Sequence, residues 1–353
     1  DISHVTTRRF DAGKGPCGIL IGVGAMIWAM SRLLVVGGTS FVGRHAVYQA
    51  VDAGHDVTVF HRGHTNPDML AGRIDHRLGD RATGDYSSLD IDETWDAVLD
   101  VSAYVPRHVH QLADALAARS GHYVHVSSIS AYDDTARITL DEDSPLWPDL
   151  TEHTEDVTGQ TYGPLKAMCE RAGHERFGEA MSIVRPTYVC GPHDATDRFT
   201  YWARRMAAGG DVAATSLDAP LQIVDARDLG AFLVTCAESA ADGPFDGVGV
   251  FAPVREMLIA ITPADVAVRL VEVDRATLDA VGVGLPLIEP EAELPELKTR
   301  PGRRAKAAGL AERSVAETAD ATRAWDAERG SPPLKVGPTA EQEADLLRRQ
   351  LDV

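Results

Sequence analysis

The sequence predicts an α/β fold: a doubly wound parallel sheet with a smaller carboxy-terminal lobe. Between residues 33 and 185, short apolar runs alternate with segments of helical length. The runs are apolar throughout, which is typical of strands buried on both faces of a parallel sheet. A glycine-rich turn joins the first run to the first helical segment. This alternation predicts right-handed crossovers, with helices on both faces of the sheet.

The first unit of this pattern is a strand, a helix and a second strand. Residues 33–36 form the first apolar strand, and a helix is expected over residues 44–53. Gly54 supplies the stop signal of that helix, and residues 57–60 form the second strand. A unit of roughly 30 residues is the normal size of a βαβ motif.

The alternation continues along the chain and loosens after Pro186. The remaining expected strands cover residues 95–101, 122–126, 181–185 and 221–224. The remaining expected helices cover residues 108–119, 164–177 and 198–208, a stretch from Asp228, and residues 339–351. After Pro253 the chain mixes helices with Pro- and acid-rich loops, such as residues 286–295, which indicates a separate lobe.

The first 29 residues are expected to be a leader or a non-native extension. An apolar run over residues 17–30 follows Arg8, Arg9 and Lys14, and it is too short and too rich in glycine for a membrane span. A signal-peptide core is the alternative. Met30 stands two residues before the first strand and marks the expected natural start, so a cytoplasmic location is expected.

Composition excludes several classes of protein. The chain of 353 residues is 44% hydrophobic and carries a formal charge of −19, so it can bury a core but repels phosphate backbones. No nucleic-acid or membrane partner is therefore expected. The cysteines show no metal or disulfide spacing and are expected to be free thiols; they are Cys17, Cys169, Cys190 and Cys236. His108 and His110 lack a carboxylate cluster, so no metal site is expected.

The glycine-rich turn predicts a phosphate site. It consists of Gly37, Gly38, Thr39, Ser40, Phe41, Val42 and Gly43. A helix that begins after such a turn presents unsatisfied N–H groups and the positive end of its dipole to an anion. Gly37 permits the tight turn, and Gly43 lets the helix pack on the strand. Ser40 takes the usual middle glycine position, where its hydroxyl can bind a phosphate oxygen. The turn therefore predicts the dinucleotide site of an NAD(P)-binding Rossmann fold, and a purely structural turn is the alternative.

The end of the second strand favours NADP, with NAD as the second choice. NAD sites often have an acid there for the ribose hydroxyls, whereas this chain has His61 and Arg62. Arg62 suits a 2′-phosphate, and Arg44 is a second candidate for it; a solvated loop arginine is the alternative. Asp80, followed by Arg81, stands where an adenine contact is expected, unless it is a plain turn aspartate.

Tyr162 and Lys166 form the predicted catalytic pair. At positions i and i+4 of a helix they share one face, and Pro164 is tolerated if it falls in the first turn. A free tyrosine has a pKa of about 10, and a nearby ammonium group is expected to lower it. Ser128 ends an apolar strand and is the expected third member, with Ser127 and Ser130 as substitutes.

These segments resemble the short-chain dehydrogenase/reductase superfamily, in its extended or atypical branch, which includes the NAD-dependent epimerase/dehydratase family. The resemblance lies in VVGGTSFVG (35–43), HVSSISAY (125–132) and YGPLK (162–166), supported by RPTYVCGP (185–192) and LQIVDARDLGAF (221–232). It implies a Ser128, Tyr162 and Lys166 triad, a nicotinamide wall at Pro186 and Val189, and dimerisation through helices of the main domain.

The GGTxFVG and YGxxK patterns resemble bacterial reductase-like members and the chloroplast stem-loop RNA-binding relatives. Departures from the family pattern weaken a UDP-sugar epimerase assignment and favour a reductase. They are Ser40, His61, the SSISAYDD segment without a Val-Tyr-Gly ending, and Gly163-Pro164-Leu165 before the lysine.

The sequence therefore predicts an NAD(P)-dependent oxidoreductase, of reductase, epimerase or dehydratase type, acting on a small polar or sugar-nucleotide-like substrate. A non-catalytic NAD(P) sensor and an RNA-binding protein of the same fold are the alternatives, the latter through a basic patch at Arg204 and Arg205. Residues 30–190, with elements around 221–240 returning, are assigned to cofactor binding. Residues 191–353 are assigned mostly to substrate binding.

Overall fold

The computed structural model describes residues 19–21, 25–27, 30–135, 141–288 and 299–351. Most of the expected leader over residues 1–29 and Cys17 lie outside these residues. Within that segment the structure describes two short strands, β1 (Ile19–Ile21) and β2 (Ala25–Ile27), which pair antiparallel.

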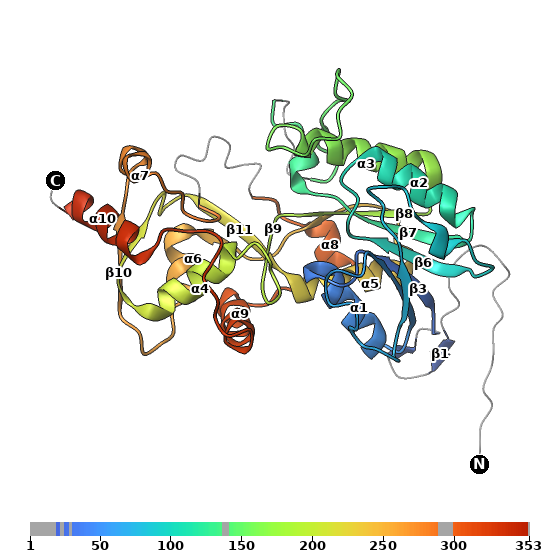
Figure 1. Ribbon diagram of the computed structural model, residues 1–353, viewed down its shortest axis with the longest axis horizontal. Helices are drawn as coiled ribbons and strands as arrows, with labels where there is room; N and C mark the ends of the chain where they lie inside the picture. Colours follow the sequence, from blue (N-terminus) through green and yellow to red (C-terminus); the bar gives the residue numbers. More distant parts are fainter. Residues whose placement is uncertain (1–18, 22–24, 28–29, 136–140, 289–298, 352–353) are drawn as a thin grey trace, which may run out of the picture.

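A seven-stranded parallel sheet forms the larger part of the molecule, as predicted (Figure 1). Its strands, in spatial order, are β12 (Gly243–Gly247), β8 (Met181–Pro186), β7 (Ser120–Val126), β6 (Trp95–Asp100), β3 (Arg32–Val36), β4 (Asp56–His61) and β5 (Asp75–Leu78). The strand order reverses between β3 and β6. Open α/β sheets bind ligands at such a switch point, beyond the carboxyl ends of the strands.

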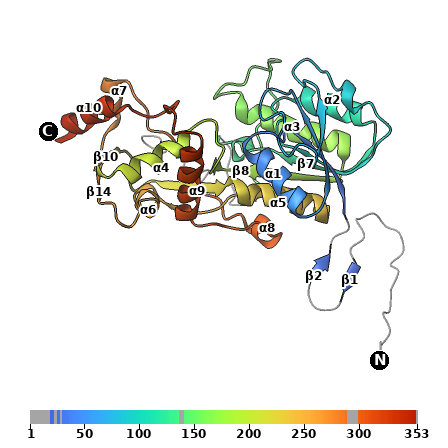
Figure 2. The same ribbon diagram turned by 60° about the horizontal axis from the view of Figure 1, so that its bottom comes forward.

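Helices cover both faces of this sheet (Figures 1 and 2). α1 (Phe41–Asp52) and α5 (Ala226–Ser239) share one core with Leu33 and Val35 of β3. α2 (Pro106–Leu116) and α3 (Tyr162–Phe177) share the other core with Leu34 and Val36. Successive residues of β3 therefore point to opposite helical layers, which is why this strand has no polar position among residues 33–36.

The second part of the molecule lies beside the sheet and has its own hydrophobic core (Figure 1). One small sheet consists of β13 (Phe251–Pro253), β11 (Pro220–Asp225) and β9 (Tyr188–Cys190), and another pairs β10 (Gly210–Ala214) with β14 (Val268–Glu272). The helices after β9, apart from α5, are α4 (Arg198–Ala208), α6 (Val254–Ala260), α7 (Arg275–Val281), α8 (Arg303–Ala307), α9 (Val315–Glu328) and α10 (Ala340–Leu351). Two 3-10 turns, η1 (Ser87–Leu89) and η2 (Ile129–Ala131), follow β5 and β7.

The structure differs from the sequence prediction mainly at short or polar elements. β5 reads Asp-His-Arg-Leu and β12 contains two glycines and a proline, so neither has the apolar pattern of a buried strand. They form because neighbouring strands of the sheet offer backbone partners. α1 begins at Phe41 and α3 at Tyr162, a few residues earlier than expected. Cys169, Cys190 and Cys236 are buried free thiols, as predicted.

Candidate functional site

A cavity of about 1260 Å³ opens at the carboxyl ends of the parallel strands. Its wall runs from the glycine turn, past the ends of β4, β6 and β7, to β9, α4 and residues 287–288. Small-molecule pockets usually enclose roughly 300–1,000 Å³. The cavity is therefore large enough for more than one ordinary ligand, and it includes every predicted site residue except Gly38 and the second-choice Arg44.

The glycine turn has the local geometry that the sequence predicted. Gly37 has φ +90°, and a Cβ there would lie 2.7 Å from Ser102 Oγ. A Cβ on Gly43 would lie 2.4 Å from the carbonyl oxygen of Gly37, so the helix packs closely on the turn. A Cβ on Gly38 would instead meet Val47 and Val59, away from the cavity. Glycine is required at all three positions for steric reasons.

Ser40 is the N-cap residue of α1, yet its hydroxyl makes no capping hydrogen bond. It lines the cavity together with Thr39, Phe41, Val42 and Gly43. The first N–H groups of a helix have no partners within the helix. An N-cap serine that leaves those groups uncapped fits an anion bound at this helix start.

His61 at the end of β4 is held in a chain of hydrogen bonds. Its Nδ1 accepts from the Gly63 N–H at 3.1 Å, so its Nε2 carries the hydrogen that is donated to His76 Nδ1 at 2.8 Å. Burial lowers the pKa of His61, so the ring is neutral. Its neighbour Arg62 is exposed at the cavity wall and pairs with no carboxylate in the described part of the chain.

The other predicted nucleotide-end residues have local partners. Arg81 forms a bidentate ion pair with buried Asp100 at 2.7 and 2.8 Å and also donates to Ser102 Oγ, so its charge is neutralised. Asp80 accepts a hydrogen bond from the Ala82 N–H, as a turn aspartate does, while still facing the cavity. Arg44 donates to the hydroxyl of Tyr48 and is not among the residues that line the cavity.

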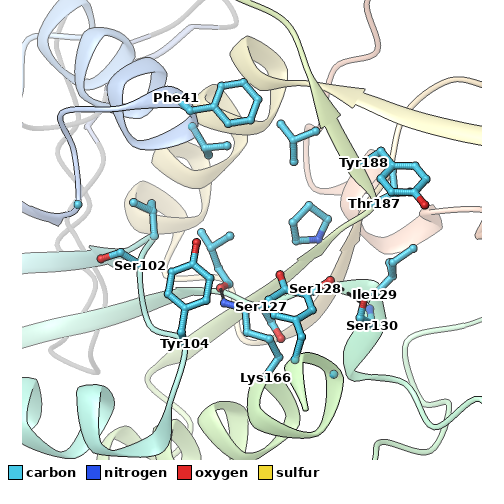
Figure 3. Close-up of a pocket in the computed structure, with 18 of the residues that line it drawn as sticks. Phe41, Ser102, Tyr104, Ser127, Ser128, Ile129, Ser130, Lys166, Thr187 and Tyr188 are labelled. Carbon is cyan, nitrogen blue, oxygen red and sulfur yellow. Dashed lines mark hydrogen bonds between the residues drawn. The ribbon is translucent and has the colours of Figure 1, made fainter. Parts of the chain in front are cut away.

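Ser128, Tyr162 and Lys166 meet on one side of the cavity (Figure 3 labels Ser128 and Lys166). The Ser128 hydroxyl lowers the pKa of the Tyr162 phenol, and its Oγ accepts a hydrogen bond from the Ser130 N–H at 3.1 Å. The buried Nζ of Lys166 donates to the carbonyl oxygens of Ala103 and Val126, each at 2.7 Å. The α3 spacing thus puts the phenol at the cavity surface and the ammonium group beneath it.

The pKa of Tyr162 differs from expectation. Burial raises it above the usual tyrosine value, while the Ser128 hydroxyl and the charge of Arg198 lower it. Desolvation also lowers the pKa of Lys166, because a buried ammonium group loses its hydration. The sequence predicted that Lys166 would lower the pKa of the Tyr162 phenol, whereas burial raises it.

A buried network lies behind this set. Ser127 Oγ donates to Glu170 Oε1 at 2.5 Å, and Arg185 holds both oxygens of Glu170 at 2.9 and 2.6 Å. Arg185 also donates to the hydroxyl of Tyr132 at 2.9 Å. Residues 126 and 127 are thus bonded to Lys166 and Glu170, which lie on the face of α3 that also carries Tyr162.

Sequence reasoning missed several cavity residues, including Tyr104 and Arg198. Tyr104 stands beside Lys166, with the ammonium nitrogen 5.1 Å from its ring centroid (Figure 3). Its position just after the end of β6, at the switch point, is the signal that could have identified it. Arg198 is the first residue of α4, and no local motif marks it.

Other predictions concern features outside the cavity. Arg204 pairs with Asp326, and Arg205 pairs with Glu343, so the basic patch on which the RNA-binding alternative depended is neutralised. Among the described residues, no helix is both long and apolar enough to cross a membrane. The same residues hold no cluster of three or more side chains suited to a metal ion.

The strand order and the glycine turn at its switch point define a Rossmann-fold protein of the short-chain dehydrogenase/reductase type. The sequence model of the NAD dependent epimerase/dehydratase family matches residues 33–247, and the chain belongs to this family. The resemblance drawn from the motifs is confirmed, and with it the assignment to a family of NAD-dependent enzymes.

Individual relatives are distant. A putative epimerase from Burkholderia cenocepacia has 19% identity, a TM-score of 0.64 and coverage of 85% of this chain and 98% of its own. WbmG of Bordetella bronchiseptica, solved with NAD, has 17% identity, a TM-score of 0.61 and coverage of 88% and 98%. At these identities the likeness concerns the fold.

A sequence relative is the chloroplast stem-loop binding protein of 41 kDa b of Arabidopsis thaliana. It is 26% identical over 192 residues, which are 50% of this chain and 47% of the relative. The match thus spans about half the length of that protein.

Proposed function

We propose that the protein is an NADP-preferring oxidoreductase that acts on a small polar substrate. Tyr162 exchanges a proton with the substrate oxygen, Ser128 holds that oxygen, and Lys166 supplies positive charge behind them. The observation that supports this proposal is that Ser128, Tyr162 and Lys166 line one cavity, which begins at the glycine turn.

The residues of the cavity fit a dinucleotide. The uncapped start of α1 and the hydroxyl of Ser40 suit the pyrophosphate, and Pro186 and Val189 supply an apolar wall near Tyr162 for the nicotinamide. Asp80 is the proposed adenine contact, whereas Arg81 acts through its ion pair with Asp100. When bound, the nicotinamide supplies or accepts the hydride.

The raised pKa of Tyr162 favours the reducing direction. A phenol that keeps its proton at neutral pH can donate it to a substrate carbonyl oxygen as that oxygen gains negative charge. The Ser128 hydroxyl, which lowers the pKa of the phenol, then stabilises the phenolate that remains. The reverse reaction requires the phenolate first, which burial disfavours.

The proposed preference for NADP rests on Arg62. The end of β4 has no carboxylate that would repel a 2′-phosphate, because His61 is neutral and bonded to His76. The guanidinium of Arg62 is exposed at the cavity wall. A planar guanidinium binds a phosphate through two parallel hydrogen bonds.

The substrate, the assembly and the location complete the proposal. The wall near Tyr162 also holds Trp147, Ser130 and Gln160, a mixture that suits a small polar ligand. A homodimer and a cytoplasmic location remain expectations. Stem-loop binding, which the name of the Arabidopsis relative gives for that protein, and RNA binding in general are disfavoured by the charge of −19.

Replacing Tyr162 by Phe tests the proposed chemistry. NADPH oxidation is measured with a panel of small aldehydes and ketones, and the cofactor dissociation constant is measured by titration. Loss of a general acid is expected to lower turnover by roughly 10²–10⁴-fold, with cofactor binding retained. Tyr48→Phe, which removes a hydroxyl outside the cavity, is the control. Unchanged turnover in Tyr162→Phe would falsify the proposed role.

A further inference from the structure

Among the residues that the structure describes, four cationic side chains line the cavity, and they differ in whether their charge is already paired. They are Arg62, Arg81, Lys166 and Arg198. Arg81 is neutralised by Asp100, and Lys166 donates to two backbone carbonyls. Arg62 and Arg198 form no ion pair with any carboxylate in the described part of the chain. Arg62 lies at the glycine-turn end, which leaves Arg198 as the remaining unpaired charge.

Arg198 is half-buried at the start of α4, and its local contacts leave most of its donors unused. Its Nε donates to Thr196 Oγ1 at 3.1 Å, and its guanidinium lies 5.7 Å from the ring centroid of Tyr188, another cavity residue. Within the described ranges, no acceptor binds its two terminal nitrogens. A guanidinium carries five N–H donors in a fixed fork, so this side chain can still bind an anion through two hydrogen bonds.

The acidic residues beside Arg198 in sequence are directed to other partners. Asp194 accepts from the N–H and hydroxyl of Thr196. Asp197 is 1% exposed and holds Arg329 at 2.7 Å and the N–H of Lys335 at 3.2 Å. The positive charge of Arg198 therefore faces the cavity without a fixed counter-ion from its own loop.

The position of Arg198 relative to Tyr162 identifies which ligand it meets. The guanidinium of Arg198 lies 5.7 Å from the ring centroid of Tyr188, which follows β8. β8 is the neighbour of the strand that precedes Ser128, whereas Arg62 follows β4 on the other side of β3. The charge of Arg198 also lowers the pKa of the Tyr162 phenol. The glycine turn and Arg62 serve the opposite part of the cavity. An anion at Arg198 would thus be part of the molecule that reacts at Tyr162, and not of the dinucleotide phosphates.

We propose that Arg198 binds a carboxylate or phosphate group of the substrate, which makes the substrate an anionic carbonyl or hydroxy compound. This inference rests on the proposed function, because it takes Tyr162 as the reacting end. The overall charge of −19 repels anions. A cation in the substrate half of the cavity offsets this repulsion for an anionic substrate.

The test uses the full chain saturated with NADP, so that the dinucleotide phosphate site is filled. Calorimetric titration compares two matched pairs of probes: glycerol 3-phosphate with glycerol, and glycolate with ethylene glycol. At least one charged probe should bind more tightly than its neutral partner, and which one does so separates phosphate from carboxylate. Arg198→Ala should lose about tenfold or more of that affinity, and Arg198→Lys should lose less.

Arg303→Ala, which removes an exposed arginine outside the cavity, is the matched control and should bind the probes like the wild type. Equal affinity of Arg198→Ala and the wild type for the charged probe would overturn the inference, as would equal binding of charged and neutral probes. If the wild type does not bind NADP, the proposed function fails. The anion site can then still be tested in cofactor-free protein, where the probe affinities of Arg198→Ala and Arg62→Ala are compared with that of the wild type.

Discussion

Glu170 and Arg185 form a bidentate ion pair directly behind Ser127 and Ser128. The side chain of Glu170 is 1% exposed and that of Arg185 is 5% exposed. The carboxylate of Glu170 accepts a hydrogen bond from Ser127, and the guanidinium of Arg185 donates one to Tyr132. The ion pair therefore holds both ends of the segment that carries Ser128. Coulombic attraction and hydrogen bonds to Glu170 raise the pKa of Arg185, so the guanidinium stays charged despite its burial.

Breaking this pair is expected to destabilise the fold. Glu170→Gln leaves a buried guanidinium without its counter-charge, which costs about 3–5 kcal/mol in proteins where one partner of such a pair is removed. Urea unfolding measures the loss. Glu179→Gln, at an exposed position beyond the end of α3, should change stability by less than about 0.5 kcal/mol. Equal stability of the two variants would mean that the ion pair is not important for the fold.

The cofactor preference can be tested at Arg62. Arg62→Ala removes the guanidinium proposed for the 2′-phosphate, so NADP affinity should fall by about tenfold or more while NAD affinity stays nearly constant. Fluorescence titration with each reduced cofactor measures the two dissociation constants. Arg44→Ala, outside the cavity, is a suitable comparison. Equal losses for both cofactors would remove the argument for NADP.

The close packing around Gly163 explains why the segment Gly163-Pro164-Leu165 departs from the usual family pattern. A Cβ at this residue would lie 2.2 Å from the carbonyl oxygen of Ser130 and 3.0 Å from Trp147 Nε1. Gly163→Ala should therefore push the start of α3 away from the segment bearing Ser128, at a cost of about 1–3 kcal/mol. Thermal unfolding and turnover should both decline. A variant as stable and as active as the wild type would show that the helix start shifts freely.

His125 predicts a loss of stability in acid. It is fully buried, its ring nitrogens have no hydrogen-bond partner among the described residues, and burial lowers its pKa to about 3. In the unfolded chain the histidine pKa is about 6.5. Between pH ~6.5 and pH ~3 the unfolded chain therefore binds a proton that the folded chain does not bind. The contribution to stability is complete above pH ~6.5 and is lost as the pH falls toward ~3.

Comparison with His125→Phe isolates this effect from that of the carboxylates. Between pH 6 and pH 4, the unfolding free energy of the wild type should fall more steeply, by up to about 1.4 kcal/mol per pH unit for one proton. Urea unfolding across this range measures both slopes. Parallel curves for the two proteins would contradict the prediction.

Much of the main sheet could be predicted from sequence because its signals are local. The apolar run over residues 33–36 and the glycine turn lie next to one another, and both have the predicted form. The bounds expected for α4 match the structure. β5 and β12 could not be predicted, because their polar and glycine-rich sequences become strands only through pairing with β4 and β8.

The candidate site likewise has features that the sequence alone determined and features that only the tertiary structure decided. The sequence alone determined the spacing of Tyr162 and Lys166, since positions i and i+4 share a helix face wherever the helix lies. Only the tertiary structure decided that Arg81 is neutralised by Asp100, that Glu170 holds Ser127, and that Arg198 faces the cavity. Burial and pairing depend on which distant segments the fold brings together. For the same reason the pKa of Tyr162 rises where its helical neighbour alone predicted a fall.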